Sequence, residues 1–356
     1  MKKEIGSIFP LWDQILKEAE SKQSDFLGDR LYYSLCREAL YDIACTHKAK
    51  NKIVLIPAYT CQTVITPFEE AGWQCEYFGI KKDLRINIEN LYETIDRFHP
   101  SLLVVHPFFG MDLNEVECDT MADFKSLGIE IILDLTQCLF SKRDYLFPSY
   151  VVASYRKWMP IPDGGYLVQK NKTNISQPQL ENNEFTEREI AAMYLRGLYF
   201  TNEEQRLKGI SMRLSKIADC LAESNIIPHR MSQIAFNLMN KEDLEYNQNK
   251  RIQNYSYLIK NVHESKRVKK VCSDFNNVTT APLYFTIYVN DRKALQRLLA
   301  EDSCYAPVIW PMEDERVLIN DDVKYIYDHL LAIPCDQRYD EADMSRVVNV
   351  INSFSK

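Results

Sequence analysis

The sequence predicts an α/β protein with a large, mostly parallel sheet covered by helices, followed by a smaller C-terminal α+β domain. Two features of the 356-residue chain indicate this arrangement. In the first half, short apolar runs alternate with longer segments of helical period, which is typical of a parallel sheet buried on both faces. After a long helical middle, strand and helix signals mix again. A chain of this length usually forms more than one domain.

The apolar runs of the first half are expected to be buried strands. The segments between them have the spacing of amphipathic helices, and Gly72 and Gly128 provide stop signals. Ligands of parallel sheets bind beyond the carboxyl ends of the strands, so polar residues at those ends are the candidates for function. The expected strands are 53–56, 75–78, 102–105, 129–134, 151–153 and 166–168. The expected helices are one that follows Pro57 and ends at Ala71, one at 88–98 and one at 114–127.

The second half is predicted to differ in architecture. Residues 185–223 are charged and helical in period, without a strand signal. Further helices are expected at 247–261, 292–300 and 341–354, with a strand at 283–289. We therefore expect an N-terminal helical segment (1–30), a large cofactor-binding domain (31–245) and a small α+β domain (246–356).

Composition excludes several classes of protein. Apolar residues make up 46% and charged residues 26%, as in ordinary globular enzymes, while the net charge of −7 argues against general nucleic-acid binding. The ten cysteines form no C-x-x-C pair, so we expect reduced thiols and no metal site. The N-terminus contains no long apolar stretch, so neither a secretory signal nor a membrane span is expected. A cytoplasmic location is the expectation that follows.

Three polar segments next to expected strands indicate a chemistry. Asp134 ends one strand and Gln137 follows it, Ser154 and Lys157 follow the next strand, and Gly164-Gly165 leads into another. A lysine amine condenses with an aldehyde as a Schiff base. A carboxylate keeps a pyridine nitrogen protonated, and the protonated ring accepts electrons when a substrate proton leaves. We expect pyridoxal 5'-phosphate as the cofactor.

Each of these residues also has a plainer interpretation. A strand-terminal Asp is often a helix cap or loop residue, and a lysine is normally a solvated surface charge. Gln137 and Ser154 could be structural hydrogen-bonding residues. His106 is expected to be a structural histidine, and Trp158 a wall of the pocket. The order and spacing of the three segments favour the cofactor interpretation.

Beyond these patterns, the chain resembles the DegT-type (DegT/DnrJ/StrS) sugar aminotransferases, as a divergent member. That family has the type I fold of pyridoxal-phosphate-dependent transferases, and the resemblance runs from about residue 30 to the C-terminus. The D-x-x-Q segment at 134–137 and the lysine segment at 154–157 are its strongest signals. Supporting matches are the helix start at 34–40, P-x-Y-T at 57–60, A-G at 71–72, V-H-x-F-G-like residues at 105–110, an R-M-S segment at 229–232 and I-P at 333–334.

The resemblance implies a role for each candidate residue. Lys157 would be the Schiff-base lysine and the acid/base that moves the substrate proton, and Asp134 would pair with the pyridine nitrogen. Gln137 would contact the phenolic-oxygen side of the ring, and Ser154 would hold the phosphate. Backbone amides of Cys36-Arg37, at a helix N-terminus, would add phosphate donors.

Other matched positions depart from the family pattern. Cys61 falls where many relatives place an aromatic stacked on the ring, so it is either a ring contact or a small buried side chain. Glu38 would bring a negative charge near the phosphate unless it points away. Pro228 replaces the asparagine that usually reaches across from the partner subunit. Arg230 could bind a substrate anion or the partner chain.

The resemblance implies an aminotransferase that moves an amino group from an amino acid, with glutamate the expected donor, to a keto sugar on a nucleotide carrier. A homodimer with no nucleic-acid or membrane partner is expected. Two alternatives stay open. One is different pyridoxal-phosphate chemistry on an amino acid, and the other is an inactive binding protein that kept the fold. Lys157 speaks against the dehydratase branch, which carries histidine instead.

Overall fold

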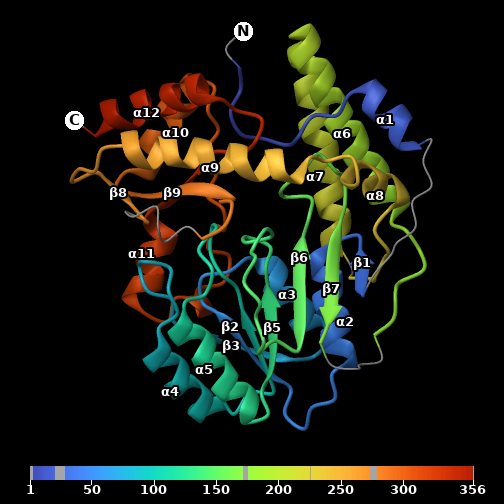
Figure 1. Ribbon diagram of the computed structural model, residues 1–356, viewed down its shortest axis with the longest axis vertical. Coiled ribbons are helices and arrows are strands. Elements are labelled where there is room, and N and C mark those ends of the chain that lie inside the picture. Colours follow the sequence, from blue (N-terminus) through green and yellow to red (C-terminus); the bar gives the residue numbers. More distant parts are fainter. Residues whose placement is uncertain (1–2, 21–28, 171–174, 225, 273–278, 356) are drawn as a thin grey trace.

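A computed structural model of the chain describes residues 3–20, 29–170, 175–224, 226–272 and 279–355. Its main feature is a seven-stranded sheet in the order β1-β7-β6-β5-β4-β2-β3 (Figure 1). The strands β2 to β6 are parallel, whereas β7 is antiparallel to β6 and β1 is antiparallel to β7. The bounds are β1 Arg30–Tyr33, β2 Ile53–Pro57, β3 Gln74–Phe78, β4 Leu102–Val105, β5 Glu130–Asp134, β6 Tyr150–Ser154 and β7 Gly165–Gln169.

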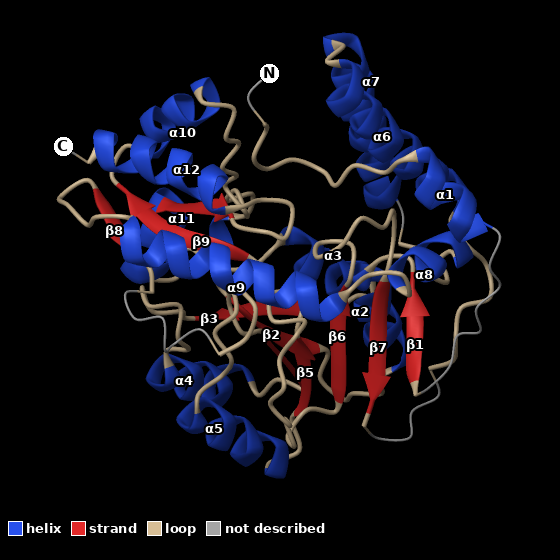
Figure 2. Ribbon diagram, turned by 45° about the horizontal axis from the view of Figure 1, so that its top comes forward, coloured by secondary structure: helices blue, strands red, loops and turns tan. Residues whose placement is uncertain are grey.

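Helices cover both faces of this sheet (Figures 1 and 2). From β2 the chain moves outward to β3 and then turns back across the sheet to β4 and β5. Because such crossovers are right-handed, α3 lies on one face and α4 and α5 on the other. The helix α2 packs beside α3 and against β6 and β7. The bounds are α2 Cys36–Thr46, α3 Gln62–Glu70, α4 Ile88–Phe98 and α5 Glu115–Ser126.

The expected helical middle is a hairpin of two long helices that projects from the body of the molecule (Figures 1 and 2). These are α6 (Asn183–Asn202) and α7 (Gln205–Ser224). The first ends at Glu203, whose φ of 58° is left-handed and therefore stops the helix. A short helix, α8 (Gln233–Met239), follows and packs on α1 (Asp13–Glu20).

The C-terminal part has a three-stranded antiparallel sheet in the order β10-β9-β8 and a hydrophobic core of its own. Phe285, Ile287, Leu331 and Ile333 from this sheet are fully buried there. Ile5 from the N-terminal segment joins the same core. The bounds are α9 Leu244–Asn261, β8 Val268–Lys270, β9 Tyr284–Val289, α10 Arg292–Glu301, α11 Asp321–His329, β10 Leu330–Pro334 and α12 Glu341–Phe354, with a 3-10 turn at Glu315–Val317.

The predicted fold class is confirmed, including the large, mostly parallel sheet and the smaller domain. The division at 1–30, 31–245 and 246–356 stays a prediction, and part of the first segment lies outside the described residues. The structure also contains four elements that the hydrophobic periodicity of the sequence did not predict: the strands β1 and β10 and the helices α8 and α11. Among the described residues, no helix is long and apolar enough to cross a membrane.

Candidate active site

The candidate site lies where four neighbouring strands end. Asp134 is the last residue of β5 and Ser154 the last of β6, while His106 directly follows β4 and Thr60 lies just beyond β2. Because β6, β5, β4 and β2 are adjacent and parallel, their carboxyl ends meet at one edge of the sheet. All four residues line a cavity of about 150 Å³. We call it the strand-end cavity.

The strand-end cavity collects nearly all of the residues that the sequence singled out. Those that line it are Cys36, Arg37, Cys61, Asp134, Gln137, Ser154 and Lys157. Arg230 is not among its lining residues, because its Nη2 lies 2.7 Å from Glu181 Oε1 and its backbone bridges to Tyr33 and Glu181. The substrate-binding role of Arg230 stays a prediction that these contacts do not support.

Asp134 is held in place by its own loop. Only 6% of its surface is exposed, and the Thr136 backbone nitrogen donates to Oδ1 over 2.8 Å. Burial raises the pKa of Asp134, while the Thr136 hydrogen bonds and the nearby Lys157 charge lower it. Gln137 is fixed in a similar way, since Phe109 N donates to its Oε1 over 3.1 Å. A positive group bound beside Asp134 would favour its charged form.

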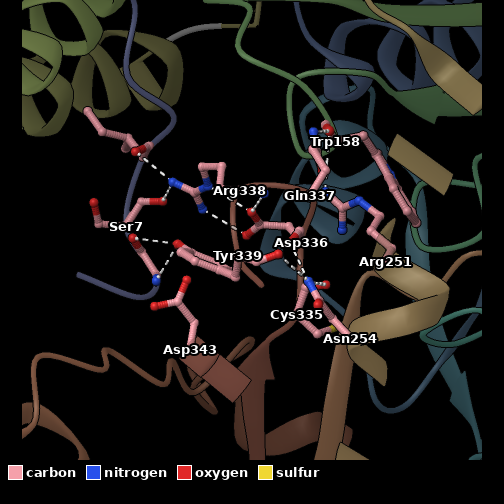
Figure 3. A network of polar contacts seen from close by, with 12 residues as sticks. Ser7, Trp158, Arg251, Asn254, Cys335, Asp336, Gln337, Arg338, Tyr339 and Asp343 are labelled. Atoms are coloured by element: carbon pink, nitrogen blue, oxygen red, sulfur yellow. Dashed lines mark hydrogen bonds and ion pairs between the residues drawn. The ribbon is translucent and has the colours of Figure 1, made fainter. Parts of the chain in front are cut away.

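The loop that carries Lys157 is anchored through the next residue, Trp158. The indole of Trp158 is fully buried, and its Nε1 donates to the Thr136 carbonyl over 2.7 Å. The Trp158 carbonyl accepts from Gln337 Nε2 over 2.8 Å and from Arg251 Nη2 over 3.3 Å (Figure 3). Trp158 is not a lining residue of the strand-end cavity, so the expectation that it walls the pocket is replaced by a role in holding the lysine loop.

The N-terminus of α2 closes another side of the cavity. Gly165 pairs with Ser154 across β7 and β6, and a Cβ on Gly165 would lie 2.8 Å from the Cys36 backbone nitrogen. Glycine at this position therefore lets the helix start approach the sheet. The N-cap residue, Leu35, has no side-chain acceptor, which leaves first-turn amides available for an anion.

Glu38 does not bring its charge to the cavity. Its carboxylate accepts from the backbone nitrogens of Leu35 and His229, at 3.4 and 3.0 Å, and lies 3.5 Å from the His229 ring. Glu38 is not a lining residue of the strand-end cavity. The orientation of Glu38 therefore keeps its negative charge from opposing a phosphate in the cavity.

Two aromatic residues of the cavity were not expected to have a functional role. His106 Nε2 lies 3.2 Å from Thr60 Oγ1, and its buried Nδ1 has no hydrogen-bond partner among the described residues. Burial, together with the charge of Lys157, lowers the pKa of His106 to about 3, so the ring is neutral. Trp310 packs on Tyr59 and His106, with ring centroids 4.8 and 5.6 Å apart. Trp310 lines the strand-end cavity together with Cys61, and no sequence motif marks it.

The donors of the strand-end cavity fit pyridoxal phosphate. An amine at Lys157, a buried carboxylate at Asp134, and a helix N-terminus near Ser154 match the aldehyde, ring nitrogen and phosphate of that molecule. His106 also lines the cavity, and its buried Nδ1 has no hydrogen-bond partner among the described residues. A second cavity of about 500 Å³ shares Arg37, Cys61 and Trp310 with the first, so the two adjoin.

Comparison with known proteins identifies the fold. No protein-family model and no curated protein sequence matches the chain. PseC of Helicobacter pylori, an aminotransferase involved in pseudoaminic acid biosynthesis, superposes with a TM-score of 0.68 at 12% identity, covering 99% of both chains. The chain has the fold of an aminotransferase.

Further solved structures support this result. The sugar aminotransferase CalS13 of Micromonospora echinospora gives a TM-score of 0.65 at 13% identity, over 99% of this chain and 100% of that one. A DegT DnrJ EryC1 StrS aminotransferase of Brucella abortus gives 0.64 at 16% identity, over 98% and 91%. At these identities the likeness establishes the fold.

Proposed function

We propose that the protein is a pyridoxal-phosphate-dependent aminotransferase. The observation that carries the proposal is the presence of Lys157 and the buried Asp134 in one cavity at the carboxyl ends of β5 and β6. The aminotransferase fold of the chain supports the same function. Strand ends in such sheets are where ligands bind.

Each residue contributes a separate part of the chemistry. The cofactor, when bound, supplies an electron sink for the bond electrons of an amino acid. Asp134 stabilises positive charge on a ring nitrogen, since an opposite charge favours the protonated form. Ser154 and the first amides of α2 bind the phosphate. Lys157 Nζ would hold the cofactor and would then act as the acid/base that moves the substrate proton from the amino carbon to the cofactor carbon.

The substrates belong to the same proposal. An amino acid, with glutamate as the leading candidate, donates the amino group, and a keto sugar or similar carbonyl compound receives it. The adjoining 500 Å³ cavity offers room for a substrate larger than an amino acid. The names of the structural relatives, which include sugar aminotransferases, favour a sugar acceptor. A homodimer is also part of the proposal.

A half-reaction tests the function without knowledge of the acceptor. The cofactor-loaded protein is mixed with each amino acid in turn, and release of the matching keto acid is measured. The proposal expects one equivalent of keto acid per site, with 2-oxoglutarate from glutamate as the leading case. Release of ammonia over many turnovers would indicate elimination chemistry instead. No product from any amino acid would contradict the aminotransferase assignment.

A further inference from the structure

Two arginine side chains in the strand-end cavity have unusual settings. Arg37 lies in the first turn of α2, and Arg156 directly precedes Lys157; both are lining residues of the cavity. A helix N-terminus carries partial positive charge, so a cation in the first turn is disfavoured there unless an anion accompanies it. The sequence patterns and the family resemblance gave no role to either guanidinium.

Neither guanidinium is neutralised at close range by the described part of the chain. Arg37 Nη1 donates to the Ala222 carbonyl over 3.2 Å, and Arg156 lies over the Phe185 ring at 5.8 Å. Neither forms a salt bridge with a described carboxylate. Asp219 and Glu223 act on Arg37, and Glu189 interacts electrostatically with Arg156, all at longer range. Burial, followed by the charge of Arg156, lowers the pKa of Arg37, which indicates two cations close together.

The charges of the strand-end cavity complement a dianion. Its charged lining residues are Arg37, Arg156, Lys157 and Asp134. With Asp134 ionised and His106 neutral, three cations face one carboxylate, which leaves a net charge of +2. A phosphate monoester carries about −1.5 to −2 at neutral pH. Arginine is suited to such a group because its planar fork donates two parallel hydrogen bonds to phosphate oxygens.

We propose that Arg37 and Arg156 together hold the phosphate of the cofactor within a single chain. This inference rests on the proposed function. It also bears on Pro228, which stands where the family resemblance places an asparagine that reaches across from the partner subunit. Two positively charged side chains of the same chain would then take the place of a neutral asparagine side chain from the partner subunit. The phosphate source could also be the diphosphate of a nucleotide-linked sugar, so the test must separate the two.

Cofactor binding provides the test. The apo form of the full chain is titrated with pyridoxal phosphate and with pyridoxal, and the lysine-bound cofactor is followed by absorbance. Binding of uridine diphosphate to the same apo protein is measured by titration calorimetry. In Arg37→Met and Arg156→Met, the dissociation constant for pyridoxal phosphate should rise by roughly ten- to a hundredfold, as expected for losing a charged hydrogen bond. Affinity for pyridoxal should change by less than about threefold, because it lacks the phosphate that the arginines contact.

Control variants make the result interpretable. Arg213→Met, at an exposed position on α7, should bind all three ligands as the unmodified protein does. Arg156→Lys keeps the charge and should recover part of the affinity. Thermal melting of each apo variant checks folding, and if Arg37→Met fails to fold, Arg156→Met decides the question alone.

Three outcomes would count against the inference, and they are distinguishable. Unchanged affinity for pyridoxal phosphate in both methionine variants would overturn it. Normal affinity for pyridoxal phosphate with lost affinity for uridine diphosphate would assign the arginines to a substrate diphosphate instead. If the unmodified protein attached neither pyridoxal phosphate nor pyridoxal, the proposed function itself would fail.

Discussion

Thr136 connects the individual residues of the candidate site. Its backbone nitrogen donates to Asp134, its hydroxyl accepts from the Ser154 nitrogen over 3.1 Å, and its carbonyl accepts from the Trp158 indole. One threonine thus contacts the Asp134 carboxylate, the end of β6 at Ser154 and the loop that carries Lys157. The pattern D-x-x-Q predicted the ends of this segment, but only the folded chain shows that its third residue joins them.

Replacing Thr136 by Val should therefore weaken both the protein and its cofactor site. The valine leaves the buried Ser154 N–H without an acceptor, which costs roughly 1–3 kcal/mol of unfolding free energy. Urea denaturation and the dissociation constant for pyridoxal phosphate measure the two effects. Thr136→Ser keeps the hydroxyl and is the control. Equal stability of the valine variant and the unmodified protein would contradict this role for the hydroxyl.

Asp163, which directly precedes Gly164-Gly165, has a structural role and should make stability depend on pH. It is fully buried and accepts from Thr186 Oγ1 at 2.7 Å and from Ser232 Oγ at 3.1 Å. Burial raises its pKa to about 7, well above the value of about 3.9 for an exposed Asp. The folded state thus binds this proton more tightly, so the contribution is complete below about pH 4 and is lost as the pH rises through about 7.

Because the folded protein binds the Asp163 proton more tightly, its free energy of unfolding should fall as the pH rises. Between pH 5 and pH 8 the unmodified protein should lose on the order of 2 kcal/mol of unfolding free energy relative to Asp163→Asn, which cannot titrate. Urea denaturation of both proteins at the two pH values measures the difference. A constant difference across this range would show that Asp163 stays ionised in the folded protein.

Residues next to recognisable strand ends could be predicted from the sequence, and residues brought in by tertiary contacts could not. Asp134, Ser154 and Lys157 follow apolar runs, so their meeting at one sheet edge was foreseeable. Trp310 reaches the cavity from a loop far along the chain and carries no local signal. For Arg230 the motif left a substrate anion or the partner chain as possible contacts, and its position beside Glu181 depends on how two loops pair.

At the scale of elements, the close approach of α2 to β7 should be sensitive to a single methyl group. A Cβ at position 165 would lie 2.8 Å from Cys36 N and 3.0 Å from Cys36 Cα, so the helix start would have to move. Gly165→Ala should cost roughly 1–3 kcal/mol of unfolding free energy and lower the affinity for pyridoxal phosphate. Calorimetric melting and cofactor titration check this expectation.

Gly72→Ala provides a comparison for the glycine substitution, because a Cβ there meets no atom within 4 Å. Its own positive φ of 77° still adds backbone strain, so a stability loss without a loss of cofactor affinity is expected. If Gly165→Ala also kept full cofactor affinity, the helix start would not be a determinant of the site.

The elements themselves were predictable to different degrees. The helix α4 and the strand β4 lie where the sequence placed them, because helical spacing and a continuous apolar run are clear signals. The expected helical run 185–223 is divided by Glu203, a residue whose left-handed φ the sequence does not announce. The edge strand β1 is short and precedes a helix, so its pairing with β7 is visible only in the fold.

At the scale of the whole molecule, the N-terminal segment ties the helical hairpin to the C-terminal core. The Glu4 carboxylate accepts from Arg196 at 2.6 Å, from Lys208 at 2.6 Å and from the Tyr199 hydroxyl at 2.8 Å. The side chains of Glu4 and Arg196 are 4% and 2% exposed. Ile5, the next residue, bridges to Cys304. Sequence periodicity cannot reveal such a link, because its members are about 200 or 300 residues apart.

Removing the charge of Glu4 should destabilise the whole protein. Glu4→Gln leaves the buried Arg196 without its counter-charge, which typically costs about 3–5 kcal/mol. Asp13→Asn is the matched control, since its ion pair with Lys17 is exposed and contributes at most about 1 kcal/mol. Urea denaturation separates the two, and similar losses in both variants would contradict the importance of the buried pair.

The most direct test of the account is chemical identification of the residue that binds the cofactor. The protein is loaded with pyridoxal phosphate, reduced with borohydride, digested and mapped by mass spectrometry, with Lys157→Ala in parallel. The account predicts a pyridoxyl group on Lys157 and loss of the yellow cofactor absorbance in the alanine variant. Modification of a different lysine, or a Lys157→Ala protein that keeps the absorbance, would contradict it.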